Sequence, residues 1–185
     1  MGSNMLQKEL IDKLHKNSIL SADEFYKILS EHDEEDSEYL FGLARKVREN
    51  IYGKDVYIRG LIEFSNYCRN DCYYCGIRRS NKNAQRYRLT EEEIMACCEN
   101  GYELGFRTFV LQGGEDPYYN DDRIVDIVQK IRAGYPDCAI TLSIGEKSYE
   151  SYKRFREAGA DRYLLRHETA NEAHYQKLHP EEMSL

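Results

Sequence analysis

The chain has 185 residues, of which 41% are hydrophobic and 32% charged, and this balance is typical of a globular domain. Its formal net charge of −7 argues against nucleic acid as the main partner, because contacts to phosphates need a basic face. No apolar run approaches the roughly 20 residues that a membrane span requires, and no charged-then-apolar leader is present, so we expect a cytoplasmic protein.

The first part of the chain predicts helices and carries no chemical motif. Residues 1–4 resemble a cloning remnant ahead of a native start at Met5, and we leave them out of the fold prediction. Apolar residues at helical spacing predict an amphipathic helix over residues 5–17. We expect residues 5–53 to form a helical cover for one end of a larger body.

Two further helices are predicted from their capping residues. Ser21 and Glu24 form a capping box, which opens a second short helix. Asp36 or Ser37 can cap a third helix, whose apolar residues share one face and which Gly53 ends.

From residue 54 onward, short apolar runs alternate with segments of helical periodicity. The predicted strands cover residues 56–64, 108–112, 139–144 and 163–166. The predicted helices run from a capping box at Thr90 to Gly105, through Ile124 to Ile131, from Tyr149 to Gly159, and from Ala170 to Leu178. This alternation implies right-handed βαβ crossovers and a parallel sheet with helices outside. Four such units make half of a (β/α)8 barrel, so we expect an α/β fold in which residues 54–185 form a truncated barrel or an open sheet.

Three cysteines stand in a C-x3-C-x2-C spacing in the loop predicted over residues 65–89, directly after the first strand. They are Cys68, Cys72 and Cys75. Three thiolates can hold three irons of a 4Fe–4S cube and leave the fourth iron without a protein ligand, open to a small molecule. A zinc site would need four ligands, commonly as paired C-x2-C units, and no second pair follows. The remaining cysteines, Cys97, Cys98 and Cys138, are interpreted as small buried hydrophobes.

The same loop is basic in an acidic chain. Six basic side chains face one acid, Asp71, and they are Arg69, Arg78, Arg79, Lys82, Arg86 and Arg88. Two interpretations stay open: these side chains pair with acidic helices elsewhere, or some of them offset the charge of a cluster or attract an anionic ligand.

Glycines and polar residues follow the predicted strands at their carboxyl ends, where ligands bind in parallel α/β proteins. The run Gly113-Gly114-Glu115 follows the second strand, and paired glycines let the backbone approach a ligand closely. Thr141 and Ser143 end the third strand and share a face. Their hydroxyls could meet a polar ligand or bond to neighbouring strands.

The fourth predicted strand ends in two charged residues. Arg166 and Glu168 share a face if the strand extends that far. An acid at a strand end can accept both hydroxyls of a ribose, and an arginine can hold a carboxylate. Ordinary charge pairing with other residues is the alternative.

The cysteine spacing resembles the cluster loop of the radical S-adenosylmethionine (SAM) enzymes. In that family the open iron chelates the amino and carboxylate groups of SAM, and an electron from the cluster cleaves SAM to methionine and a 5′-deoxyadenosyl radical. The resemblance implies that Gly113, Gly114 and Glu115 form the family's GGE motif, whose backbone accepts the SAM amino group. It also implies that Tyr74, just before the third cysteine, packs by the adenine.

Longer segments resemble the FeFe-hydrogenase maturases of the HydE type, with methylornithine synthase and biotin synthase as further relatives. These segments are Cys68–Arg79, Arg86–Arg88, Leu111–Pro117 and Asp161–Asn171. By this resemblance, the three cysteines of the loop hold the cluster, Arg166 and Glu168 contact SAM, and Thr141 and Ser143 line the substrate cavity.

The resemblance further implies an anaerobic enzyme on the route to the diiron subcluster of the hydrogenase. Its expected partners are a small-molecule or iron-complex substrate, an external electron donor and other maturation proteins. The family's later strands supply further SAM and cavity residues, which a truncated barrel would lack. Two alternatives stay open: a mutase similar to methylornithine synthase, and a non-catalytic iron–sulfur or zinc-binding fragment.

Overall fold

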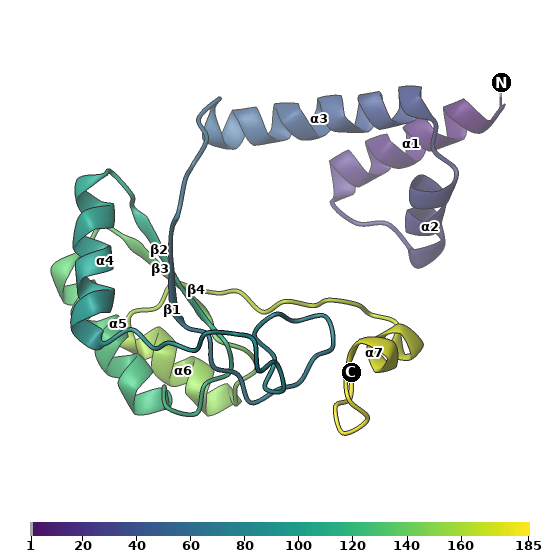
Figure 1. Cartoon of the computed structure of the whole chain (residues 1–185). Helices are drawn as coiled ribbons and strands as arrows, with labels where there is room; N and C mark the ends of the chain where they lie inside the picture. The colour runs from purple at the N-terminus through teal and green to yellow at the C-terminus, as the bar shows by residue number, and fades with distance from the viewer. Residues whose placement is uncertain (1) are drawn as a thin grey trace. The chain divides into compact units, whose positions relative to one another are not determined.

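The computed structural model describes residues 2–185 (Figure 1), and the chain divides into two compact units, Met1–Tyr57 and Ile58–Leu185. The sequence pattern predicts this division between residues 53 and 54. Of the expected cloning remnant, Met1 lies outside the described residues, and Gly2 already begins the first helix. Every helix within residues 2–185 is too short or too polar to cross a bilayer.

The first unit contains three helices, α1 (Gly2–Asn17), α2 (Ala22–Ser30) and α3 (Glu34–Tyr52). The capping box of Ser21 and Glu24 at the start of α2 is confirmed, with both of its hydrogen bonds present. The helices pack around a small apolar cluster, which consists of Leu10, Ile11, Leu20 and Ile28.

The predicted start of α3 is wrong. Neither Asp36 nor Ser37 caps this helix, because Asp33 has the extended backbone of an N-cap and its carboxylate accepts the amide of Asp36 at 2.9 Å. Asp36 is instead the N3 residue of the capping box that Asp33 opens, and it is almost fully buried. Both residue types suit an N-cap, so the pattern alone did not distinguish the two positions.

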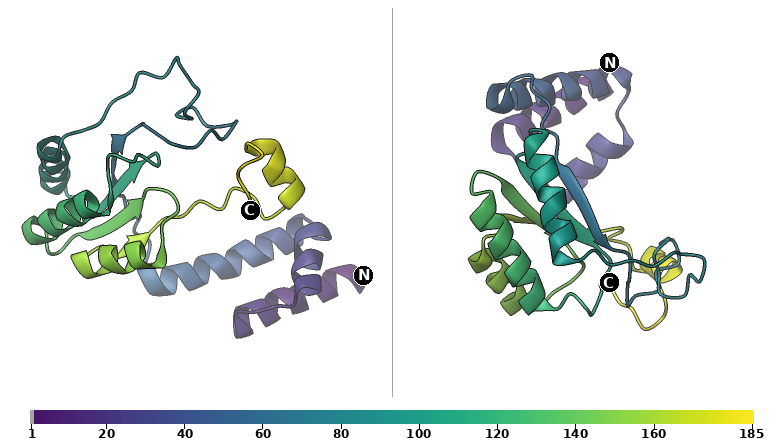
Figure 2. Two further views of the ribbon diagram at one scale, coloured as in Figure 1. Left: turned by 90° about the horizontal axis from the view of Figure 1, so that it is seen from below. Right: turned by 60° about the vertical axis from the view of Figure 1, so that its left-hand side comes forward.

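The second unit is built on a parallel sheet with the strand order β1-β2-β3-β4. Its strands are β1 (Gly60–Ser65), β2 (Thr108–Gly113), β3 (Ala139–Ser143) and β4 (Arg162–Tyr163). Its helices are α4 (Glu91–Glu103), α5 (Asp121–Gly134), α6 (Tyr149–Ala158) and α7 (Glu172–Leu178). Helices α4, α5 and α6 cover one face of the sheet (Figure 2), as the strand–helix alternation predicts.

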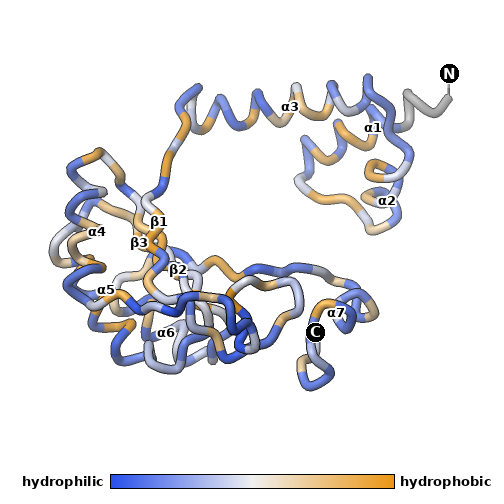
Figure 3. Tube along the Cα trace, viewed as in Figure 1, coloured by the Kyte–Doolittle hydropathy of each residue, from blue (hydrophilic) through white to orange (hydrophobic). Residues whose placement is uncertain are grey.

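Alternate side chains of each strand enter the core beneath these helices, and the strands are among the most hydrophobic stretches of this unit (Figure 3). The strands contribute Ile62, Phe64, Phe109, Leu111, Ile140 and Leu142, and the helices contribute chiefly Ile94, Ile124, Ile131 and Phe155. The intervening strand residues, such as Leu61 and Glu63, therefore point to the opposite face.

The first and fourth strands are shorter than predicted, because part of each predicted segment has no neighbouring strand to pair with. Residues Val56 to Ile58 are exposed and unpaired, since the ladder between β1 and β2 begins only where Gly60 meets Phe109. Strand β4 pairs with β3 over two residues, and the segment from Leu164 onward leaves the sheet. The premise that Arg166 and Glu168 share the face of a strand is therefore wrong.

Candidate functional site

A cavity of about 560 Å³ opens at the carboxyl ends of the strands. Its lining includes every predicted site residue except Thr141: Cys68, Cys72, Tyr74, Cys75, Gly113, Gly114, Glu115, Ser143, Arg166 and Glu168. Thr141 lies buried on β3, and its hydroxyl has no hydrogen-bond partner in the described part of the chain. Residues from the loop after β1, from two strand ends and from the segment after β4 thus converge on one space, whose volume suits a small-molecule ligand.

The three loop cysteines are free thiols, each partly exposed. Burial raises the pKa of the Cys72 thiol, and the neighbouring Cys68 and Cys75 raise it further, so the three sulfurs lie within electrostatic reach of one another. Within residues 2–185, no three His, Cys, Asp or Glu side chains converge tightly enough for a single metal ion. A cubane cluster does not need such convergence, because each thiolate binds a different iron.

Of the other cysteines, Cys98 and Cys138 are buried as predicted. The prediction for Cys97 is wrong, because its thiol lies on the exposed side of α4.

The loop that carries the cysteines (residues 65–89) has almost no regular secondary structure, so its backbone carbonyls need other partners. Arg86 supplies several of them, since its guanidinium donates to the carbonyls of Asn66, Ile77, Arg78 and Asn81. The Arg86 side chain therefore connects the start of the loop, at Asn66, with its middle, at residues 77–81.

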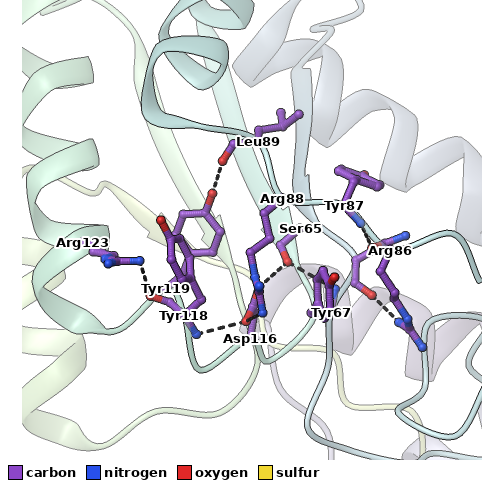
Figure 4. A network of polar contacts seen from close by, with 11 residues as sticks. Ser65, Tyr67, Arg86, Tyr87, Arg88, Leu89, Asp116, Tyr118, Tyr119 and Arg123 are labelled. Atoms are coloured by element: carbon purple, nitrogen blue, oxygen red, sulfur yellow. Dashed lines mark hydrogen bonds and ion pairs between the residues drawn. The ribbon is translucent and has the colours of Figure 1, made fainter.

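Asp116, directly after the GGE run, joins both ends of the loop to the end of β2 (Figure 4). Its carboxylate accepts two hydrogen bonds from Arg88, at 2.6 and 2.9 Å, and one from the Ser65 hydroxyl at 2.6 Å. Arg88 also lies over the ring of Tyr67, at 3.8 Å from its centroid. Burial alone would raise the pKa of Asp116, but the hydrogen bonds from Arg88 and Ser65 favour the ionised form, and the pKa is lowered.

Glu115 makes a second connection between the same two segments. Its carboxylate accepts hydrogen bonds from Arg69 and Asn70, the latter at 2.9 Å, and its carbonyl accepts the Arg69 amide at 3.0 Å. Two arginines of the loop therefore pair with the acids at the end of β2. The interpretation in which they pair with acidic helices elsewhere is wrong for Arg69 and Arg88.

Gly114 is required by packing against the cysteine loop. A Cβ at this position would lie 2.1 Å from the carbonyl oxygen of Tyr67 and 2.8 Å from the Cβ of Cys68, both far inside contact distance. Gly145, with a φ of +79°, similarly leaves room for the side chain of Glu115. The close backbone approach that we expected of the glycine pair is thus made toward the cysteine loop.

Sequence reasoning missed several polar residues that line the cavity, among them Glu63 and Gln112. Glu63 and Gln112 are paired in register on β1 and β2, and Gln112 lies opposite Ser143 on β3. Gln112 donates to Glu63 at 3.3 Å and accepts from Arg166 at 3.3 Å. The signal was available, since both are polar residues within apolar strands, at positions that alternate with core residues.

Glu168 has a left-handed backbone, with a φ of +57°. This conformation is uncommon for a residue other than glycine and costs free energy, which the surrounding structure must offset. Backbone strain of this kind is concentrated at functional sites, and here it occurs at a carboxylate that lines the cavity.

A family model described as the radical SAM superfamily matches residues 62–183. The [FeFe] hydrogenase maturase subunit HydE of Thermotoga maritima is 47% identical over 177 residues, which cover 96% of this chain and 50% of that protein. The 3-methylornithine synthase of Methanosarcina acetivorans is 37% identical over 171 residues, which cover 90% of this chain and 48% of that protein.

Solved structures agree with this relationship. The maturase HydG matches with a TM-score of 0.83 and 31% identity, over 95% of this chain and 40% of that one. Methylornithine synthase matches with a TM-score of 0.79 and 34% identity, over 94% of this chain and 52% of that one. The four-stranded sheet corresponds to the first half of the TIM-type barrel of these structures, and the chain spans about half the length of the curated relatives that it matches.

The Asp116 network generates a prediction about stability. Replacing Asp116 by alanine leaves Arg88 and Ser65 without their buried acceptor, so we expect the free energy of unfolding to fall by about 3 kcal/mol. Asp122, an exposed acid paired with Arg154, is the matched control, and Asp122→Ala should cost less than about 1 kcal/mol. Urea unfolding followed by circular dichroism measures both changes.

The difference should also depend on pH in a defined direction. Because the pKa of Asp116 is lower in the folded state, its contribution is fully present above the ordinary aspartate pKa of about 4 and is lost as the pH falls through the folded value. A stability gap between wild type and Asp116→Ala that widens in acid would contradict this assignment.

A second prediction concerns the contact of Gly114 with the cysteine loop. We expect Gly114→Ala to displace the loop and to weaken cluster binding about tenfold or more, as the loss of an outer-shell support does at metal sites. The iron retained per chain after anaerobic reconstitution and desalting should therefore fall. Gly76 lies in the same loop with open space around its Cα, so Gly76→Ala should bind iron like the wild type. Equal iron content in the two variants would show that the close contact is unimportant.

Proposed function

The chain belongs to the radical SAM superfamily, and on this premise we propose that it forms the cluster- and SAM-binding part of an enzyme that cleaves SAM reductively. One observation carries the proposal. The three cysteines, the glycine pair and the Arg166–Glu168 segment, which are separate in sequence, line a single cavity at the carboxyl ends of the strands.

Cys68, Cys72 and Cys75 are the proposed ligands of a 4Fe–4S cluster. They fit the group in number, chemistry and position, since three free thiols of one loop face one cavity and no fourth cysteine lines it among the described residues. When bound, the cluster supplies the electron for SAM cleavage at an iron that has no protein ligand.

The protein side chains would bind and orient SAM around that iron. The backbone of Gly113, Gly114 and Glu115 would accept the amino group, which is consistent with the engagement of the Glu115 carboxylate by Arg69 and Asn70.

The segment after β4 and the cysteine loop would hold the rest of the molecule. Arg166 can pair with the SAM carboxylate, and Glu168 can accept the ribose hydroxyls. Tyr74, from the loop, would pack by the adenine. All three side chains line the cavity.

We further propose that the substrate occupies the part of the cavity beside Ser143, with Thr141 below it. The unsatisfied Thr141 hydroxyl supports a polar ligand there. Glu63 and Gln112 are additional candidates for substrate contacts, because they line the cavity from the ends of the adjoining strands β1 and β2, with Gln112 opposite Ser143.

The finer proposal is a role of the HydE type in the assembly of the FeFe-hydrogenase diiron cluster. It is supported by the 47% identity to the HydE subunit of Thermotoga maritima. The enzyme would act in the cytoplasm on a small-molecule or iron-complex substrate, with an external electron donor and other maturation proteins as partners. A mutase similar to 3-methylornithine synthase is the second candidate, at 37% identity.

The coarser proposal is tested by reconstitution. We expect roughly four irons per chain and a change in the EPR signal of the reduced cluster when SAM is added. Cys72→Ala should abolish both, while Cys97→Ala, at the exposed thiol of α4, should abolish neither. One zinc and no iron in the wild type would refute the proposal in favour of a zinc-binding fragment, and a cluster that ignores SAM would favour an electron carrier.

The finer proposal is tested by complementation. A hydrogenase maturation mixture that lacks only its HydE component should regain activity when a protein containing this chain is added. Formation of 3-methylornithine, with no gain of hydrogenase activity, would instead favour the second candidate.

A further inference from the structure

His179 is buried in a part of the chain that is otherwise largely exposed. Its side chain is 3% exposed, whereas most residues of α7, directly before it, lie at the surface. It also lines the cavity that contains the cysteines. A buried imidazole in such a segment must be held by specific contacts, and its partners show what it does.

The first contacts are between rings. The imidazole stacks on Tyr175 with ring centroids 3.8 Å apart and an interplanar angle of 17°. It meets Tyr74 edge-on, with centroids 5.5 Å apart at 86°. Tyr74 lies between the second and third cysteines, so His179 joins α7 to the part of the loop that would surround the cluster.

A backbone hydrogen bond reinforces this junction. The amide of Tyr73 donates to the carbonyl of Leu178 at 2.8 Å, one residue away from the ring contact on each segment. The segment that follows β4 is therefore attached to the cysteine loop through both main chain and side chains, at adjacent residues.

The hydrogen bonds of the imidazole determine its tautomer. Nδ1 lies 2.9 Å from the carbonyl oxygen of Tyr175, and because a carbonyl only accepts, Nδ1 carries the proton. In the neutral ring Nε2 is then an acceptor, and it lies 3.5 Å from the Tyr74 hydroxyl. The Tyr74 hydroxyl lies within reach of this acceptor and also interacts with the Cys72 thiol, so Tyr74 is held between His179 and one of the loop cysteines.

We propose that His179 is a positioning residue that fixes Tyr74 against α7 and thereby shapes the adenine-binding side of the cavity. The inference rests on the proposed function, in which Tyr74 packs by the adenine of SAM. In this role His179 positions Tyr74 and takes no part in the chemistry. It acts by removing the rotational freedom of Tyr74, whose ring would otherwise be ordered only when SAM binds.

The test uses the full chain after anaerobic reconstitution, with SAM as the ligand. The readouts are iron and sulfide content, and the Kd for SAM from the EPR change of the reduced cluster. We expect His179→Ala to keep its cluster and to raise this Kd about tenfold, as for the loss of an aromatic contact and a hydrogen bond. His174→Ala, at an exposed histidine of α7 that contacts Thr169, should leave the Kd unchanged.

A double-mutant cycle separates positioning from general support. His179→Phe keeps the ring contacts, Tyr74→Phe keeps the ring, and each removes one partner of the same hydrogen bond. If His179 acts through Tyr74, each variant raises the Kd a few-fold and the double variant is no worse than either single one. A merely structural role would lower the urea midpoint and leave the two effects additive.

Two results would overturn the inference. One is a wild-type Kd for SAM in a His179→Ala variant that carries a full cluster. The other is additivity of the His179→Phe and Tyr74→Phe effects on the Kd. The second result decides the matter if His179→Ala fails to take up iron. Failure of the proposed function is distinguishable from both, because the wild-type chain itself would then show no SAM-dependent EPR change.

Discussion

The geometry of the site depends on the attachment of one irregular loop to the end of one strand. Glu115 and Asp116 follow the glycine pair of β2, and their carboxylates bind Arg69 and Arg88 near the two ends of the cysteine loop. Gly114 allows the backbones of the two segments to touch. Arg69 is largely exposed, whereas the Asp116 carboxylate is buried. A pair with a buried charge contributes little net stability but has strict geometric requirements, and here the Arg88–Asp116 pair fixes the loop relative to the sheet.

The parallel sheet determines what this loop can meet. Because every strand ends at the same edge, the residues that follow β1, β2, β3 and β4 gather on one side although they are far apart in sequence. The apolar side chains beneath α4, α5 and α6 make this edge a rigid base. Cysteines on an irregular loop and charged residues on the segment after β4 thereby come to border the same cavity.

Much of this arrangement could be predicted from the sequence, because it follows from local rules. Strand–helix alternation predicts the parallel sheet, and the capping box at Thr90 predicts the start of α4. The errors lie where tertiary contacts decide. Val56 has strand propensity but no partner strand, and Arg69 and Arg88 could have paired with any acid. The edge-on contact of His179 with Tyr74 joins residues that are 105 positions apart in sequence.

The guanidinium of Arg86 has a consequence for how the cysteine loop can change. One planar group donates to carbonyls at four positions between residues 66 and 81, and its five donors have a fixed geometry that lysine lacks. Inserting or deleting a residue between those positions would carry at least one carbonyl out of its reach. The hydrogen bonds of Arg86 thus restrict the length of the loop, independently of what the thiols bind.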